Sequence, residues 1–154
     1  MGIKTMTRAA ADNKYLHRDF HVSTDIGINY IGTHYGNEGV VEYLRRYATS
    51  FLSPLVEEIK KDGLVALKRY FEDLYMQEEM PEVLHTVLSN GSLEVTIDRC
   101  PAVTFMRKSG HTPSKWYIET VNTVYKTVAE AAGIGFELLY YHTEDGSSSY
   151  RFFL

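Results

Sequence analysis

The sequence predicts an α+β fold, in which a helical N-terminal half packs on a four-stranded antiparallel sheet made of two hairpins that flank a helical segment. Two observations lead to this prediction. Apolar residues recur at helical spacing as far as Glu79, and the hydrophobic period then changes to that of strands. Asn90-Gly91 and Asp145-Gly146 each stand between short apolar segments, as the turns of β-hairpins do.

The first two predicted helices meet at Gly36. Asp12 or Asn13 can cap the first helix, because their side chains accept hydrogen bonds from free backbone N–H groups. Gly36 is placed to end this helix, and Asn37 is placed to cap the next one. The apolar positions expected to face the core are Leu16, Phe20, Gly27 and Ile31 in the first helix, and Val40, Val41, Leu44 and Tyr47 in the second.

Two further helices complete the N-terminal half. Ser53-Pro54 reads as a cap followed by proline at the first helical position, and Asp62-Gly63 ends this third helix. The fourth helix begins at Leu64 and continues to about Glu79, shortly before Pro81.

The second half of the chain predicts two hairpins separated by helices. Strands are expected at 83–88 and 93–97, and again at 136–141 and 149–153. Alternation of apolar and polar residues over 93–97 indicates that one sheet face is buried. Helices are expected at 101–108 and from about Trp116 to Gly133. We expect the hairpins to join into one sheet with the helices on one face.

Composition sets limits on the function. The 154 residues suit one domain, which we place at 12–154 after a flexible N-terminal arm at 1–11. A net charge of -4 without a Lys/Arg run argues against a nucleic-acid partner. One cysteine excludes an internal disulfide, and no apolar run resembles a signal peptide or spans a bilayer. We therefore expect a cytoplasmic protein without a membrane partner.

A polar stripe on the first helix is the most informative pattern. Asn13, His17, His21 and Asp25 follow one another at four-residue spacing and share one face. Two such histidines can reach one substrate or one metal, and Asn13 or Asp25 can orient an imidazole. The zincin glutamate is missing and no cysteine is nearby, so we expect no metal. The alternative is that the stripe is the solvated side of an amphipathic helix.

Cys100 is the second candidate, because it stands where a strand ends and a helix begins at Pro101. The positive end of the helix dipole, with Arg99 beside it, favours a thiolate, which a histidine could assist as a nucleophile. The alternative is a small residue that fills a corner of the core. Glu119 is either an acid or base in a desolvated site or a first-turn carboxylate that interacts with the helix dipole.

Tyrosine is abundant, with 12 copies. Its apolar ring and polar tip suit a pocket wall or a subunit interface, and the alternative is that these rings fill the edges of the core.

The segments Asn13–His21 (NKYLHRDFH) and Cys100–Val103 (CPAV) resemble motifs of a bacterial family, the L-2-amino-thiazoline-4-carboxylic acid hydrolase-like proteins. This resemblance covers most of the chain after about Asp12. The second half is also similar to the small-ligand-binding domain of vinyl-reductase-type proteins, which implies a sheet and helices around an apolar ligand pocket.

The resemblance implies a hydrolase that opens a non-peptide C–N bond of a small cyclic amidine-like compound, without a cofactor. His17, His21 and Cys100 would be catalytic, and Asn13 would orient a partner. From the residues themselves, we expect Arg99 to bind a substrate carboxylate, and Asp25 and Glu119 to complete the substrate site. The alternatives are a non-catalytic sensor or binding domain with an apolar pocket, and a structural partner that works as a homodimer.

Overall fold

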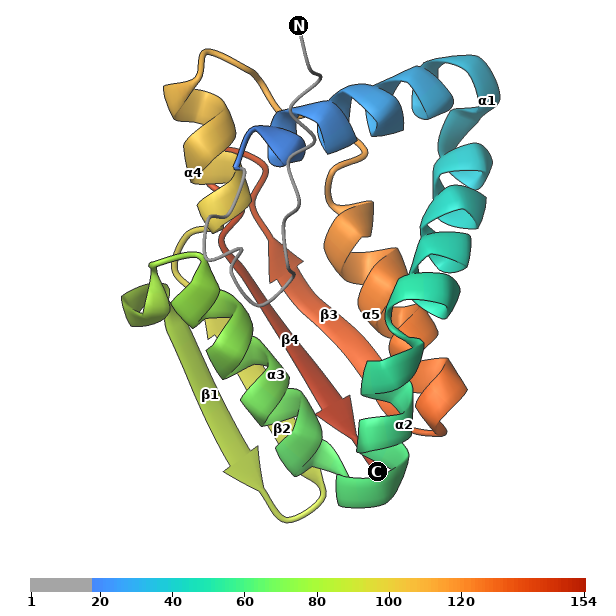
Figure 1. The fold of residues 1–154 in the computed structure, drawn as a ribbon, viewed down its shortest axis with the longest axis vertical. Coiled ribbons are helices and arrows are strands. Elements are labelled where there is room, and N and C mark those ends of the chain that lie inside the picture. The colour runs from blue at the N-terminus through green and yellow to red at the C-terminus, as the bar shows by residue number, and fades with distance from the viewer. Residues whose placement is uncertain (1–17) are drawn as a thin grey trace, which may run out of the picture.

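The structure, a computed structural model, describes residues 18–154 and confirms the predicted α+β class. The strands are β1 (Leu84–Ser89), β2 (Ser92–Ile97), β3 (Gly135–Tyr141) and β4 (Ser148–Phe153). They form one sheet in the order β1-β2-β4-β3, and each neighbouring pair is antiparallel. The two hairpins thus join through β2 and β4, as the sequence predicts (Figure 1).

The helices are α1 (Asp19–Phe51), α2 (Ser53–Asp62), α3 (Leu64–Gln77), α4 (Pro101–Lys108) and α5 (Glu119–Ala132), and a short 3-10 turn (Pro81–Val83) precedes β1. α3 packs on β1 and β2, whereas α5 packs on β3, so both cover the same face of the sheet (Figure 1). α1 in turn packs on α4 and α5. None of the helices in the described part of the chain combines the length and the apolar character that crossing a bilayer requires.

α1 bends sharply at Gly36. This residue has φ 71° and ψ −172°, a backbone conformation that side-chain-bearing residues rarely adopt. The segment before the bend crosses one end of the fold, and the segment after it runs beside α5 (Figure 1). The predicted boundary between two helices is therefore present as a corner within α1.

The first segment of α1 is oriented differently from the expectation. His21 and Asp25 are buried together with Ile28 and Gly32, whereas Phe20 is 50% exposed. The prediction that Phe20 faces the core is therefore wrong, and the polar stripe is not the solvated side. Its members at positions 13 and 17 lie outside the described residues.

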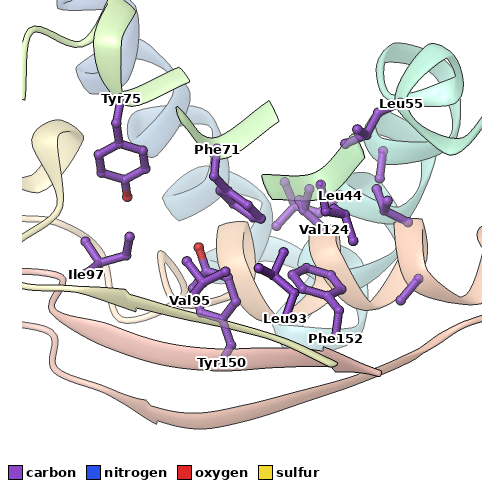
Figure 2. Packing of buried hydrophobic residues seen from close by; sticks show 14 of the residues in the cluster. Leu44, Leu55, Phe71, Tyr75, Leu93, Val95, Ile97, Val124, Tyr150 and Phe152 are labelled. Carbon is purple, nitrogen blue, oxygen red and sulfur yellow. The ribbon is translucent and has the colours of Figure 1, made fainter. Parts of the chain in front are cut away.

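The core lies between the sheet and the helices (Figure 2). Phe71 of α3 is fully buried above the sheet, and its ring centroid lies 5.2 Å from that of Tyr125 on α5. Tyr150 and Phe152 of β4 face the same layer, as do the apolar residues of β2. Each buried ring of this size contributes about 1.5–3 kcal/mol to folding. Tyr125 and Tyr150 also line the cavity described next.

Candidate functional site

A cavity of about 280 Å³ lies between the sheet and the helices. Residues of α1, α3, α4, α5, β3 and β4 contribute to its wall, as do residues next to these elements. Eight of the 12 tyrosines line it, among them Tyr75, Tyr117 and Tyr141. This placement supports the interpretation that the tyrosine excess serves a pocket wall rather than the edges of the core alone.

His21, Glu78 and Cys100 are the polar residues of this wall that carry acid–base or nucleophilic chemistry. His21 lies in the first turn of α1, Glu78 directly follows α3, and Cys100 directly precedes α4. The helical half thus folds back so that His21 and Cys100 share one cavity. His17 and Asn13, which were expected to act with them, lie outside the described residues.

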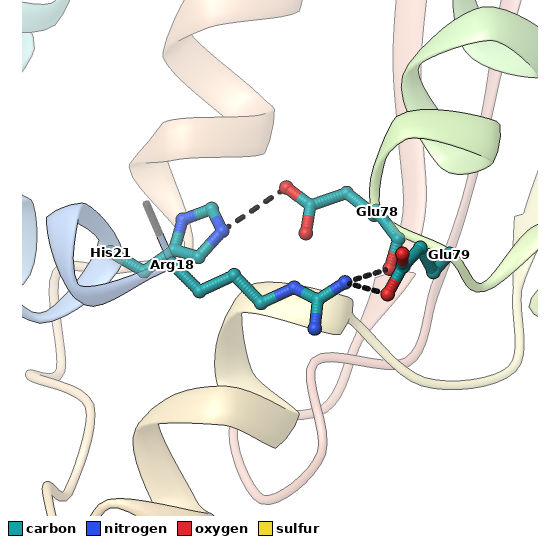
Figure 3. A network of polar contacts seen from close by, with 4 residues as sticks. All are labelled: Arg18, His21, Glu78 and Glu79. Carbon is teal, nitrogen blue, oxygen red and sulfur yellow. Dashed lines mark hydrogen bonds and ion pairs between the residues drawn. The ribbon is translucent and has the colours of Figure 1, made fainter. Parts of the chain in front are cut away.

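The imidazole of His21 pairs with the carboxylate of Glu78 (Figure 3). Nε2 of His21 lies 3.1 Å from Oε1 of Glu78, and the two side chains are only 9% and 10% exposed. With Glu78 ionised, Nε2 carries a proton and donates a hydrogen bond to the carboxylate. In the neutral imidazole, Nδ1 is then the unprotonated nitrogen, which is the form that a general base requires.

Arg18 fixes the backbone beside this pair. Its guanidinium donates hydrogen bonds to the backbone carbonyl of Glu78, at 3.2 Å, and to Oε2 of Glu79, at 2.7 Å (Figure 3). Glu79 has φ 58°, which is uncommon for a residue with a side chain. These contacts hold the C-terminal end of α3 against the start of α1, and so they hold Glu78 against His21.

Cys100 occupies the N-cap position of α4, as the sequence predicts. The backbone N–H groups of Ala102 and Val103 lower the pKa of the thiol, but burial raises it more, and the result is a pKa above the ordinary value. The Glu78 carboxylate adds to the increase. The helix start does favour the thiolate, but the expectation of a lowered thiol pKa is wrong, because desolvation outweighs the N-terminal hydrogen bonds.

The turn between β3 and β4 closes over Cys100. The backbone N–H of Cys100 donates to the carbonyl of Asp145 at 2.8 Å. A Cβ atom added at Gly146 would lie only 2.4 Å from Cβ of Cys100. Glycine at position 146 therefore permits the hairpin turn to approach the start of α4.

Burial favours the neutral form of the hydroxyls of Tyr70, Tyr75, Tyr117 and Tyr125 in the cavity wall. Burial raises the pKa of Tyr70 to about 12 and raises the pKa of Tyr75, Tyr117 and Tyr125 well above its ordinary value. Glu78 contributes to the raised pKa of Tyr75 and Tyr117. The interior of the cavity therefore disfavours a new negative charge.

Asp25 lies away from the cavity wall and holds a loop. It is 1% exposed, and its carboxylate accepts hydrogen bonds from Ser114 and from Nε2 of His111. The loop between α4 and α5 is thereby attached to α1. The expected role of Asp25 in the substrate site is not supported, because its oxygens are already occupied by this loop.

Arg99 and Glu119 also lie outside the cavity wall. Arg99 is exposed, and its guanidinium lies 3.4 Å from Oε1 of Glu82. Glu119 begins α5 and accepts a 2.5 Å hydrogen bond from the hydroxyl of Thr123. Their positions do not support the substrate contacts expected of them, and Glu119 instead matches the alternative of a first-turn carboxylate.

Glu78 belongs to the candidate site but is not predicted from the sequence. It stands just past the end of α3 and belongs to no spacing pattern, so only the tertiary fold reveals its contact with His21. Among residues 18–154, no group of three or more His, Cys, Asp and Glu side chains could hold a metal ion.

Comparison with protein-family models, with curated proteins and with solved structures found no match. The resemblance to the amino-thiazoline carboxylate hydrolases therefore stays a prediction, as do the cytoplasmic location and the homodimer.

Proposed function

We propose that the protein is a hydrolase of small cyclic amidine-like compounds and that it opens their C–N bond inside this cavity. The observation that carries the proposal is the His21–Glu78 pair in the wall of a cavity of about 280 Å³. A cavity of this size suits a small molecule. A histidine oriented by a buried carboxylate is the usual arrangement of a general base.

In the proposed reaction, Nδ1 of His21 takes a proton from a water molecule while the water oxygen bonds to the amidine carbon. The ring C–N bond then breaks, and the proton passes from His21 to the departing nitrogen. Glu78 is a positioning residue, because it fixes the tautomer of His21 and stabilises the imidazolium that forms. Water is consumed, and no other reactant is needed.

Cys100 offers a second route within the same cavity. His21 would take the proton of the thiol, sulfur would bond to the amidine carbon, and the ring nitrogen would leave with that proton. Water would then bond to the same carbon, the C–S bond would break, and His21 would pass one proton of the water to the departing sulfur. The raised pKa of Cys100 disfavours this route, because the resting thiol is neutral and must first be deprotonated in a desolvated place. We therefore prefer direct attack by water.

Turnover of 2-aminothiazoline and related cyclic amidines tests the proposal. We expect His21→Gln to lower kcat by about 10²- to 10⁴-fold, which is the usual contribution of a general base. Glu78→Gln should also lower kcat, because Glu78 orients the imidazole of His21. Cys100→Ala should retain activity if water attacks directly, and loss of activity would instead select the thiol route.

His85→Gln is the matched control. Nε2 of His85 pairs with Oδ2 of Asp98 at 2.8 Å, but the His85 side chain is 56% exposed on β1 and does not line the cavity. We expect wild-type rates from this variant. Equal rates in wild type and His21→Gln would refute the mechanism, and absence of turnover by the wild type across the panel would refute the hydrolase.

A non-catalytic sensor or binding domain is the second candidate. The tyrosine-rich wall and the neutral Cys100 thiol favour it, because both suit retention of a ligand without a reactive group. This candidate predicts saturable binding without turnover, and binding that His21→Gln leaves within a few-fold of wild type.

A further inference from the structure

The charged side chains of the cavity wall are of one sign. Among the described residues that line it, Glu78 is the one carboxylate, and lysine and arginine are absent. The remaining polar groups are hydroxyls, the Cys100 thiol and the His21 imidazole. The guanidinium of Arg18 is directed to the backbone carbonyl of Glu78 and to the carboxylate of Glu79.

One oxygen of Glu78 has no hydrogen-bond donor among residues 18–154. Oε1 is paired with His21, and within residues 18–154 no donor is bonded to Oε2. The side chain as a whole is only 10% exposed, so a group that pairs with it would do so in a largely water-free place. Charge-assisted hydrogen bonds are strong under these conditions.

The aromatic wall also favours positive charge. The faces of tyrosine rings carry negative potential and attract organic cations. Burial keeps the hydroxyls of Tyr75, Tyr117 and Tyr125 neutral by raising their pKa, so the wall contributes rings and hydroxyl dipoles rather than fixed charges. A carboxylate placed among these residues would lose its hydration and would be repelled by Glu78.

We propose that this cavity binds a small planar organic cation, an amidinium or guanidinium, with its N–H groups on the Glu78 carboxylate and its apolar part among the tyrosine rings. The inference rests on the proposed function, which places the substrate in this cavity. It specifies that the substrate is a protonated amidine that has no carboxylate group. Protonation also makes the amidine carbon a better electrophile for water. Binding of the substrate and its reaction with water then both depend on the positive charge of the amidinium.

Calorimetric titration with three ring compounds of similar shape tests this assignment: benzamidine as the cation, benzamide as the neutral analogue and benzoate as the anion. For the wild type, we expect benzamidine to bind at least about tenfold more tightly than benzamide. Benzoate should bind more weakly than benzamide. Benzoate affinity equal to or above that of benzamidine would overturn the proposal, and this result needs no variant.

Glu78→Gln keeps the size of the side chain and removes its charge. We expect this variant to bind benzamidine within about threefold of benzamide, because the charge preference is lost. Glu82→Gln is the matched control, since Glu82 is another carboxylate shortly after α3 but its side chain is 61% exposed and does not line the cavity. It should keep the wild-type preference. A preference that survives in Glu78→Gln would contradict the role of Glu78, provided that circular dichroism shows both variants folded.

Different results would reject the hydrolase proposal and the cation-binding proposal. Turnover of amidines without a cation preference would reject the charge assignment alone. Tight benzamidine binding that depends on Glu78, without turnover of any cyclic amidine, would reject the hydrolase and leave a cation-binding domain.

Discussion

Asp25 on α1 and Ser114 in the loop after α4 stand 89 positions apart in the chain, and the carboxylate of Asp25 accepts both the backbone N–H and the hydroxyl of Ser114. The distances are 2.9 Å from the N–H to Oδ2 and 2.8 Å from the hydroxyl to Oδ1. His111 adds a 2.7 Å contact through Nε2. This loop continues into Tyr117, so the carboxylate also positions one side of the cavity.

Asp25→Ala should destabilise the fold strongly. The substitution leaves two part-buried donors of Ser114 without their acceptor, and a donor that stays unsatisfied costs about 1–3 kcal/mol. We therefore expect the free energy of unfolding in urea to fall by about 3 kcal/mol or more. Asp98→Ala is the control, because Asp98 also contacts a histidine but is 54% exposed. Its effect should stay below about 1 kcal/mol. Equal effects of the two substitutions would contradict the buried role of Asp25.

Elements encoded by local signals could be predicted from the sequence. The turns at Asn90-Gly91 and Asp145-Gly146, the bend at Gly36 and the bounds 101–108 of α4 all depend on the conformational preferences of a few neighbouring residues. The role of Asp25 could not be predicted, because the donors that it satisfies lie far along the chain. Helical spacing places His21 and Asp25 on one face, but it does not determine whether that face is exposed to solvent or buried.

In the candidate site, too, features set by neighbouring residues could be predicted, whereas contacts between distant residues could not. His21 and Cys100 were identified from the spacing of polar residues and from a helix start, and both line the cavity. The contact of Glu78 with His21 could not be predicted, because no local pattern links a carboxylate just past a helix end to a histidine 57 positions earlier. The ionisation of Cys100 was mispredicted because the helix dipole can be inferred from sequence, whereas the degree of desolvation cannot.

Gly32 is required by the contact between α1 and Trp116. A Cβ atom added at Gly32 would lie 2.4 Å from two atoms of the Trp116 ring, so the ring or the helix would have to move. We expect Gly32→Ala to lower the free energy of unfolding by about 1–3 kcal/mol through overpacking. The fluorescence of Trp116, the only tryptophan, should change in the folded state as its surroundings shift.

Gly27→Ala is the matched control on the same helix. A Cβ atom at Gly27 would meet nothing within 4 Å. Alanine is favoured over glycine in a helix by up to about 1 kcal/mol, so this variant should be as stable as the wild type or more stable. Opposite signs for the two substitutions are expected. Similar effects would show that helix propensity, rather than the Trp116 contact, decides both.

The buried tyrosines make the fold sensitive to alkaline pH. Burial raises the pKa of Tyr75, Tyr117, Tyr125 and Tyr150 well above its ordinary value in the folded state. In the unfolded chain the same hydroxyls ionise near pH 10, so above that pH the unfolded state binds fewer protons than the folded state. The free energy of unfolding must then decrease as the pH rises. This stabilising contribution is complete below about pH 10 and is lost as the pH approaches the folded pKa values.

Urea titrations between about pH 8 and about pH 10.5 should show this decrease, and the absorbance of tyrosinate should rise for these residues in the same cooperative step as unfolding. Tyr125→Phe removes one buried hydroxyl, so the decrease with pH should be shallower in this variant. Tyr35→Phe is the control, because Tyr35 is 71% exposed and its hydroxyl meets water in both states. Its pH dependence should match the wild type. Gradual ionisation of the buried tyrosines while the protein stays folded would contradict their closed packing around the cavity.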